Sequence, residues 1–397
     1  MLFQTLDEKE KCVAIFLDGE LSKKEIPQNL TKTWSYSSFL KSHDVLYANL
    51  YCNGKTLTEV CPEELSSDWE RISDRLKAFY RSFVEAKVSL NDNCFFDLVP
   101  EQFLLEFCDL KNKITEHVLD EYEKPTNYEF LEDLTKLVTQ IKYQPLNIDL
   151  SPIRHRMTEY KTRQFCKKIN RIEPYVKYNV FGTKTGRLTT VKNSFPILTL
   201  DKTYRSIVKP KNDWFMEFDY NAAELRTLLA LANKEQPAQD MHEWNVENLY
   251  NGNLSRKEAK ERVFAWLYNP NSKDTSFSKA YEREEVLKRY WDGKCVKTHY
   301  DREIEADAHH ALNYIIQSTF SDLMLRQTLK LSKILNGRKS QVAFMIHDSV
   351  VIDLAEEDAD ILNDLYHTFA DTEFGAFKTN ATAGKNFGEM KELWIKY

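Results

Sequence analysis

The chain has 397 residues, of which 42% are apolar and 29% are charged, so it is long enough for two or three soluble domains with sizeable cores. No run approaches the roughly 18 apolar residues of a membrane span, and the first residues, MLFQTLDEKEKC, lack the pattern of a signal peptide. The seven cysteines form no CxxC pair, which argues against a zinc site and favours reduced thiols in a cytoplasm.

The net charge of −6 disfavours a nucleic-acid partner, but the distribution of the charges favours one. Residues 151–211 hold fifteen Lys and Arg against three Asp and Glu, a local charge of +12 that leaves −18 for the rest of the chain. A basic segment on an acidic body is typical of a groove that follows a phosphate backbone. A solvated basic face explains the same charges equally well.

Short strands are expected in the first 60 residues, where the apolar segment CVAIFL precedes Asp18-Gly19, a strong hairpin signal. Asp18-Gly19-Glu20 also has the D-x-E spacing of proofreading exonucleases. The hairpin explains this spacing more simply, and about 95 residues before the first helical pair are too few for a full nuclease fold. We therefore expect no intact exonuclease in this part.

Residues 66–145 are predicted to be helical. Apolar residues recur at helical spacing between 103 and 118 and again between 131 and 141, and prolines follow at 125 and 145. Two amphipathic helices with a short link between them predict an antiparallel pair.

Two aspartates follow or interrupt apolar strands. Asp219 ends the predicted strand WFMEFDY, and Asp348 lies at the tip of a hairpin predicted in QVAFMIHDSVVIDL. Asn221 and Glu224 have capping-box spacing at the start of the helix that follows the first strand. If both elements belong to one sheet, the carboxylates converge and can hold Mg²⁺ together with a substrate phosphate. Taken singly, Asp219 is explained as a residue at the start of a helix and Asp348 as a turn residue.

A more specific signal lies in SRKEAKERVFAWLYNP, where Ser255 and Glu258 form a predicted capping box. Cationic side chains at the N-terminal end and aromatic ones at the C-terminal end recur every four residues along one stripe about 18 Å long. These are Arg256, Lys260, Phe264 and Tyr268. A nucleoside triphosphate has the same polarity, and the helix dipole adds positive potential at the cationic end. The alternative is an ordinary amphipathic helix with Val263 and Leu267 facing inward.

Together these motifs resemble the family A DNA polymerases, the group that contains the bacterial repair polymerase and several phage replicases. The resemblance runs in order from about residue 183 to the C-terminus. It rests on TGRL at 185–188, DYNAAELR at 219–226, Asp240-x-His242, the stripe on the predicted finger helix, Asn313-x3-Gln317 and His347-Asp348.

The resemblance implies a role for each matching residue. Asp219 and Asp348 would be the catalytic residues and would hold two Mg²⁺ ions with the backbone carbonyl of Tyr220. The triphosphate and its sugar and base would contact Arg256, Lys260, Phe264, Tyr268, His242 and Glu224. The primer–template would contact Arg187, Asn313, Gln317, His347 and His309. Glu224 would occupy the space of a 2′ hydroxyl and bond to Tyr268, which favours deoxynucleotides.

The sequence departs from the family pattern at several positions. Ser349 replaces the carboxylate that follows the second catalytic aspartate, which removes a nearby negative charge and predicts retuned activity. His309 stands where the family usually has Arg, and a solvent-facing His in the helix explains it as well as a DNA contact. Asn269 replaces a Gly, and only 78 residues separate Tyr268 from His347, so the fingers are expected to be short.

The expected fold is α+β, a right-hand polymerase of palm, fingers and thumb with a small N-terminal α/β extension. The expected ranges are 1–96 for the N-terminal domain, 97–178 for a helical thumb, 179–240 and 305–397 for the palm, and 241–304 for the fingers. The expected partners are primer–template DNA, deoxynucleoside triphosphates and a separate proofreading exonuclease or processivity factor, without a membrane. The alternatives are a degenerate polymerase that serves as a DNA-binding scaffold and a single-subunit RNA polymerase. The compact form favours phage or mobile-element replication in a bacterial or infected-host cytoplasm.

Overall fold

The chain forms two compact units, Met1–Tyr143 and Gln144–Tyr397. The computed structural model describes residues 1–8, 12–23, 27, 29–41, 43–89, 93–269, 272 and 274–393. The boundary between the units falls inside the range expected to form the thumb, and the division into thumb, palm and fingers remains a prediction. Across the described ranges, no helix is both long enough and apolar enough to cross a membrane.

The first unit contains a three-stranded antiparallel sheet in the order β1-β2-β3. Leu17 pairs with Glu20, and both residues between them have positive φ angles, 50° at Asp18 and 87° at Gly19. Two positive φ angles are the geometry of a tight two-residue hairpin turn, so the hairpin prediction is confirmed. The strands of this unit are β1 (Gln4–Glu8), β2 (Cys12–Leu17), β3 (Glu20–Ser22), β4 (Lys32–Thr33) and β5 (Leu46–Tyr47).

Helices make up the rest of the first unit. The apolar stripes predicted for the two long helices are buried, from Phe103 to Val118 and from Leu131 to Ile141. The sequence predicts that these two helices pack against each other. Instead, each packs mainly against other elements, and both contact the short helix α1. The helices are α1 (Ala48–Tyr51), α2 (Leu57–Val60), α3 (Glu63–Glu85), α4 (Phe95–Leu98), α5 (Glu101–Glu121) and α6 (Tyr128–Lys142).

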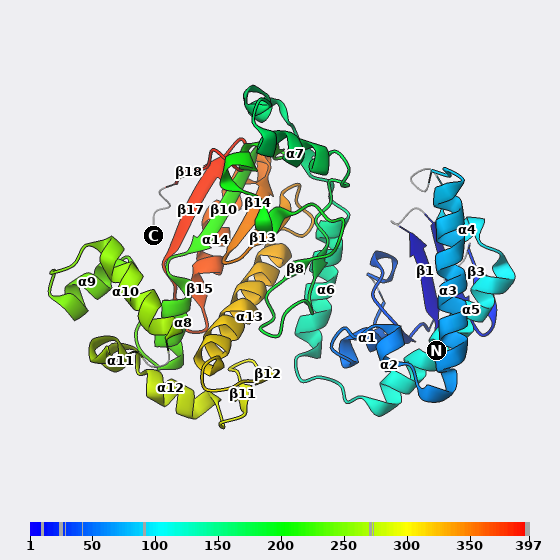
Figure 1. Ribbon diagram of the computed structural model, residues 1–397, viewed down its shortest axis with the longest axis horizontal. Helices are drawn as coiled ribbons and strands as arrows, with labels where there is room; N and C mark the ends of the chain where they lie inside the picture. The colour runs from blue at the N-terminus through cyan, green and yellow to red at the C-terminus, as the bar shows by residue number, and fades with distance from the viewer. Residues whose placement is uncertain are drawn as a thin grey trace. The chain divides into compact units, whose positions relative to one another are not determined.

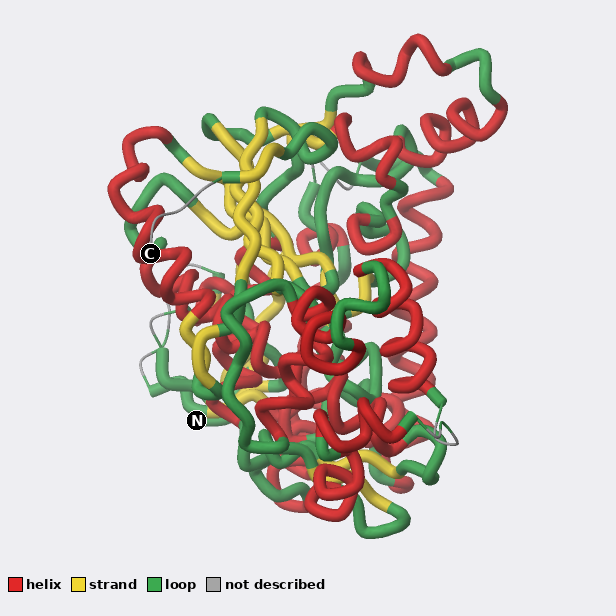
Figure 2. Tube along the Cα trace, turned by 90° about the vertical axis from the view of Figure 1, so that its left-hand side faces the viewer, coloured by secondary structure: helices red, strands yellow, loops and turns green. Residues whose placement is uncertain are grey.

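The second unit is built on a five-stranded antiparallel sheet in the order β13-β14-β10-β17-β18. Figure 1 shows its strands side by side, with α13 and α14 packed along them, and Figure 2 shows its twist. The strands are β10 (Trp214–Tyr220), β13 (Gln341–Ile346), β14 (Ser349–Leu354), β17 (Thr379–Gly384) and β18 (Lys391–Glu392). The predicted strand and the predicted hairpin are therefore neighbours in one sheet.

Aromatic packing fixes the position of the central strand. On β10, Phe218 stacks on Phe369 with ring centroids 5.9 Å apart, and Tyr220 stacks on the same ring at 4.3 Å. The Tyr220 hydroxyl donates a hydrogen bond to the Phe369 carbonyl at 2.6 Å. Phe369 belongs to α14 (Leu362–Ala370), so this helix holds the end of the strand that carries Asp219.

A helical subassembly follows β10 in the chain and gathers at one end of the sheet in Figure 1. Its core contains Trp266, Phe277 and Tyr281, all buried, and the long helix α13 contributes Ile315 and Ile316. The helices are α8 (Ala223–Leu231), α9 (Met241–Tyr250), α10 (Arg256–Tyr268), α11 (Thr275–Tyr281), α12 (Arg283–Tyr290) and α13 (Ala311–Ile334).

The remaining elements of the second unit are short. The helix α7 (Tyr160–Ile169) lies in the basic segment, and its ring Phe165 stacks on Tyr204 at 4.1 Å. The short strands are β6 (Asn147–Ile148), β7 (Tyr178–Asn179), β8 (Thr189–Thr190), β9 (Val208–Lys209), β11 (Cys295–Lys297), β12 (Glu303–Glu305), β15 (Asp371–Thr372) and β16 (Gly375–Ala376).

The oxidation state of the cysteines differs at one position from the reduced thiols expected from the sequence. Free thiols are present at Cys52, Cys61, Cys108, Cys166 and Cys295, whereas Cys94 takes part in a disulfide. The expectation of reduced thiols is therefore wrong at Cys94, because the approach of two sulfur atoms depends on the folded backbone and not on spacing along the chain.

Candidate active site

Asp219 and Asp348 converge at the same edge of the sheet. Asp219 on β10 is directly opposite Ser349 on β14, and Asp348 is the residue before Ser349. Ile346 pairs with Ser349, so His347 and Asp348 alone form the turn of the β13–β14 hairpin. Both carboxylates line one cavity of about 450 Å³. Because both elements belong to one sheet, the two aspartates lie close together as predicted.

The hairpin turn that presents Asp348 has an unusual backbone. His347 has a φ of 51°, a left-handed conformation that a residue other than glycine adopts rarely and at an energetic cost. The surrounding strand pairing holds it there, because β13 and β14 are hydrogen-bonded on both sides of the turn. Such a turn keeps the backbone of Asp348 in one orientation at the edge of the cavity.

Negative charge accumulates around Asp219. Burial, together with the charges of Asp348 and Glu217, raises the pKa of Asp219 to about 7, while a hydrogen bond with Asn380 and the charge of Lys202 oppose this rise. The neighbouring carboxylates therefore repel one another. A bound cation would relieve this repulsion.

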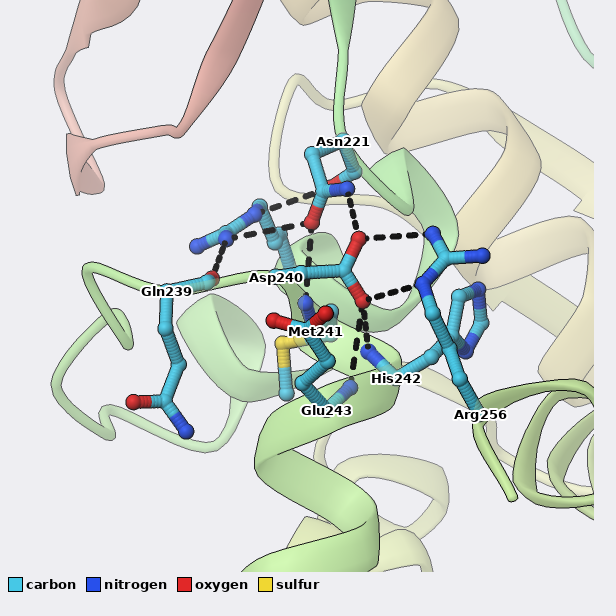
Figure 3. A network of polar contacts seen from close by, with 8 residues as sticks. Asn221, Gln239, Asp240, Met241, His242, Glu243 and Arg256 are labelled. Atoms are coloured by element: carbon cyan, nitrogen blue, oxygen red, sulfur yellow. Dashed lines mark hydrogen bonds and ion pairs between the residues drawn. The ribbon is translucent and has the colours of Figure 1, made fainter.

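A second group of polar contacts is centred on Asp240, between the sheet and the helices (Figure 3). Its carboxylate accepts two hydrogen bonds from Arg256, at 2.7 and 3.1 Å, and one from the Asn221 side chain at 2.7 Å. It also caps α9 by accepting from the backbone N–H groups of His242 and Glu243. Burial raises the pKa of Asp240, but the hydrogen bonds from Arg256 and Asn221 outweigh it and hold the pKa well below its usual range.

Asn221 belongs to this network and is not a helix cap. The helix α8 begins at Ala223, and no side chain caps it; Ala222 before it has a φ of 51°. The capping box predicted from Asn221 and Glu224 is therefore wrong. The Asn221 side chain instead accepts from the Met241 N–H at 2.9 Å, so it joins the end of β10 to the start of α9.

The helix α10, which carries the predicted stripe of cationic and aromatic side chains, has the predicted local structure. Ser255 and Glu258 form the predicted capping box. Val263 and Leu267 are buried as the inward face, while Arg256, Lys260 and Phe264 line the cavity beside the two aspartates. Both faces of the helix are thus used: one packs in the core, and the other presents two cations to the cavity.

His242 is a buried polar side chain at the cavity wall. It is 4% exposed, its ring lies 6.0 Å from that of Phe264, and its Nδ1 has no hydrogen-bond partner. Burial lowers the pKa of His242 to about 4, with the charges of Arg256 and Lys260 acting in the same direction and Asp240 opposing them. His242 is therefore neutral near pH 7 in the free protein and retains an unused polar atom.

Glu224 joins two other predicted residues. One of its carboxylate oxygens accepts a hydrogen bond from Arg187 at 3.0 Å, and the other accepts one from the Tyr268 hydroxyl. Burial and this contact raise the pKa of Tyr268, so the phenol stays protonated and acts as the donor. The Gln317 side chain also bonds to Tyr268. Glu224 and Tyr268 thus meet as the family resemblance implies.

The turn before Arg187 is closely packed. Gly186 has a φ of 75°, and a Cβ atom there would lie 2.6 Å from the guanidinium of Arg302. That guanidinium is held by the buried carboxylate of Asp322 at 2.7 Å. Glycine at this position therefore lets the backbone approach the Arg302–Asp322 pair, which positions the loop that carries Arg187.

Of the residues predicted to contact DNA, three lie outside the cavity lining, whereas Arg187 and His347 are part of it. Asn313 and Gln317 are one turn apart on α13, and neither lines the cavity. His309 is exposed in the turn before α13, with its N–H bonded to Asp307, so its placement within a helix is wrong. Asn380, which bonds to Asp219, was missed, since β17 carries no motif that marks it.

The residues present fit a metal site completed by substrate. Within the described residues, no group of three or more His, Cys, Asp or Glu side chains is arranged to hold a metal ion by itself. Two carboxylates beside the backbone of Tyr220 are an incomplete set of hard oxygen ligands, and Mg²⁺ commonly completes such a set with phosphate and water oxygens. The convergence of the two carboxylates in one cavity favours a cation here, and burial together with the charges of Asp348 and Glu217 raises the pKa of Asp219.

Comparison with known proteins finds similarity to a solved DNA polymerase domain. No protein-family model and no curated protein sequence matches it. Among solved structures, it is similar to the "POL domain of Pol1 from M. smegmatis complex with DNA primer-template and dNTP". The TM-score is 0.57 at 11% identity, over 72% of this chain and 76% of that chain. The chain therefore has an α+β fold of the kind found in a DNA polymerase domain.

Proposed function

We propose that this protein is a template-directed DNA polymerase of the family A type. The observation that carries the proposal is one cavity that brings Asp219 and Asp348 together with Arg256 and Lys260. Carboxylates for metal ions and cations for phosphates are the parts that phosphoryl transfer requires, since its catalysis is mostly positioning and electrostatics. The polymerase fold and the basic segment 151–211 support the same proposal.

Asp219 and Asp348, with the Tyr220 carbonyl, would hold two Mg²⁺ ions. Bound there, the ions would lower the pKa of the primer 3′ hydroxyl and stabilise the leaving phosphate oxygen. Arg256 and Lys260 would bind the triphosphate from the start of α10, where the helix dipole also favours anions.

Two further residues would act on the bound triphosphate. His242 would donate from its unpartnered Nδ1 once anionic oxygens raise its pKa from about 4. Arg256 would have to leave or share the Asp240 carboxylate to reach the phosphates.

The sugar would be selected by Glu224. The contact between its carboxylate and Tyr268 would leave no room for a 2′ hydroxyl, and a polar group buried there without a partner is costly. This contact favours a DNA polymerase over a single-subunit RNA polymerase. The role in phage or mobile-element replication rests on the family resemblance alone.

Primer extension on a primed DNA template with Mg²⁺ tests the proposal directly. We expect incorporation of deoxynucleotides, and a loss of roughly a thousandfold or more in Asp219→Ala and Asp348→Ala, because each removes a metal ligand worth several kcal/mol. Asp364→Ala, an exposed carboxylate on α14, is the matched control and should retain activity.

Two outcomes separate the alternatives. DNA binding without any extension by the unaltered protein would favour a scaffold. Equal incorporation of ribo- and deoxynucleotides would favour an RNA polymerase.

A further inference from the structure

Glu217 lies behind the two aspartates and is connected to them. It is two residues before Asp219 on β10, so both side chains project from the same face of the sheet. Ser349 is opposite Asp219 on one side, and Thr382 is opposite Glu217 on the other. These four residues therefore form one polar patch across three adjacent strands.

Both oxygens of the Glu217 carboxylate accept hydrogen bonds within this patch. The Ser349 hydroxyl donates to one at 2.8 Å, and the Thr382 hydroxyl donates to the other at 3.4 Å. Among the residues that the structure describes, no Lys or Arg forms an ion pair with Glu217. Glu217, two residues away from Asp219 on the same face of the sheet, therefore has hydrogen-bond partners but no ion-pair partner in the described part of the chain.

Ser349 links this charge to the hairpin turn. Its side chain is 3% exposed, and its hydroxyl lies 3.2 Å from the Ile346 carbonyl on the other side of the turn. The hydroxyl has a single proton, and the shorter contact to a charged acceptor is the stronger hydrogen bond. Glu217 therefore orients Ser349, the residue that follows Asp348.

We infer that Glu217 on β10 supplies the negative charge that family A DNA polymerases carry at the position of Ser349. Through its hydrogen bond with the Ser349 hydroxyl, Glu217 also positions the neighbouring Asp348. Glu217 does not line the cavity, so it is a positioning residue and not a metal ligand. The inference rests on the proposed function. It explains how a serine can follow the second aspartate without loss of the local charge.

The first test measures metal binding apart from catalysis. Mn²⁺ is titrated into the full chain with a dideoxy-terminated primer–template and a matching deoxynucleoside triphosphate, and free Mn²⁺ is followed by paramagnetic resonance. We expect Glu217→Gln to weaken Mn²⁺ binding roughly fivefold, since it removes a charge at short range but keeps an acceptor for Ser349. Glu392→Gln, on the exposed strand β18, is the matched control and should bind as the unaltered chain does.

The second test moves the charge. The double variant Glu217→Ser with Ser349→Glu places the carboxylate on β14, and we expect Mn²⁺ affinity to return to within about twofold of the original value. In primer extension, Glu217→Gln should raise the Mg²⁺ concentration needed for half-maximal rate by a similar factor and change the rate at saturating Mg²⁺ less. A merely structural role would not produce this separation.

The outcomes distinguish this inference from the proposed function. Failure of the unaltered chain to extend primers overturns the proposed function. If it extends primers but Glu217→Gln binds Mn²⁺ with unchanged affinity, the inference is overturned instead. A folded double variant, judged by its melting temperature, that does not recover Mn²⁺ binding also overturns it.

Discussion

At the scale of single residues, the buried carboxylate of Asp219 lowers the stability of the free protein at neutral and higher pH. The pKa of Asp219 is raised to about 7 by burial and by its acidic neighbours, far above its value in an unfolded chain. The folded state therefore binds more protons than the unfolded state between about pH 4 and 7. Stability contributed by this residue is full below about pH 4 and is lost as pH rises through 7.

Asp219→Asn should therefore stabilise the free protein at pH 8 by about 1–2 kcal/mol, a value reduced for the partial exposure of the side chain, and should leave it unchanged near pH 4. Thermal unfolding at the two pH values checks this. Addition of Mg²⁺ should raise the melting temperature of the original chain more than that of the variant. Equal melting temperatures at pH 8 would contradict the repulsion, and Asp364→Asn serves as the exposed control.

Glu224 makes a second prediction at this scale. Because its carboxylate contacts Tyr268 and Arg187, Glu224→Ala should open space beside the sugar. We expect the ratio of ribo- to deoxynucleotide incorporation to rise roughly tenfold or more. Single-nucleotide insertion with each triphosphate measures the ratio, and Glu243→Ala, exposed on α9, should leave it unchanged.

At the scale of elements, the start of α10 determines where the cationic side chains lie. Ser255 caps this helix, and Arg256 is its first residue. Ser255→Ala should cost about 1 kcal/mol of stability and fray the first turn. We expect KM for deoxynucleotides to rise severalfold with little change in kcat, and Ser255→Asp, which also caps, should restore it. An unchanged KM would show that packing of the buried face of α10 is enough to hold Arg256 in place without the cap.

The β13–β14 hairpin determines where Asp348 lies, just as the start of α10 determines where Arg256 lies. Its two-residue turn contains a strained His347, and Ser349 ties the turn to β10 through Glu217. The sheet order therefore connects two motifs that are 129 residues apart in the sequence.

At the scale of the whole molecule, the charge is divided. Residues 151–211 carry +12 in a chain of net charge −6. If this segment follows a phosphate backbone, DNA affinity should fall steeply with salt. Replacement of Lys167 and Lys168, both exposed on α7, by Gln should reduce the slope of log affinity against log salt by about 2.

Fluorescence anisotropy at several salt concentrations measures this slope. Replacement of two exposed lysines outside the segment, Lys257 and Lys391, is the control. An unchanged slope after Lys167 and Lys168 are replaced would favour a solvated basic face.

Local patterns in the sequence predicted local structure well. The strand that ends at Asp219, the hairpin with Asp348 at its tip, the Asp18-Gly19 turn and the Ser255 capping box are all present. Each depends on interactions between residues a few positions apart, so local sequence is enough to predict it.

Contacts between distant segments depend on the folded arrangement and could not be read from local spacing. Local spacing predicts that Asn221 caps a helix, but its side chain bonds to Asp240 in the folded chain. The helices α5 and α6 each pack against α1. Asn380 reaches Asp219, and Glu217 reaches Ser349, through the order and register of strands in the sheet. Local sequence thus predicts that Asp219 ends a strand and that Asp348 lies in a hairpin turn. Strand pairing places Asn380, Glu217 and Ser349 beside them, because pairing joins residues that no local spacing relates.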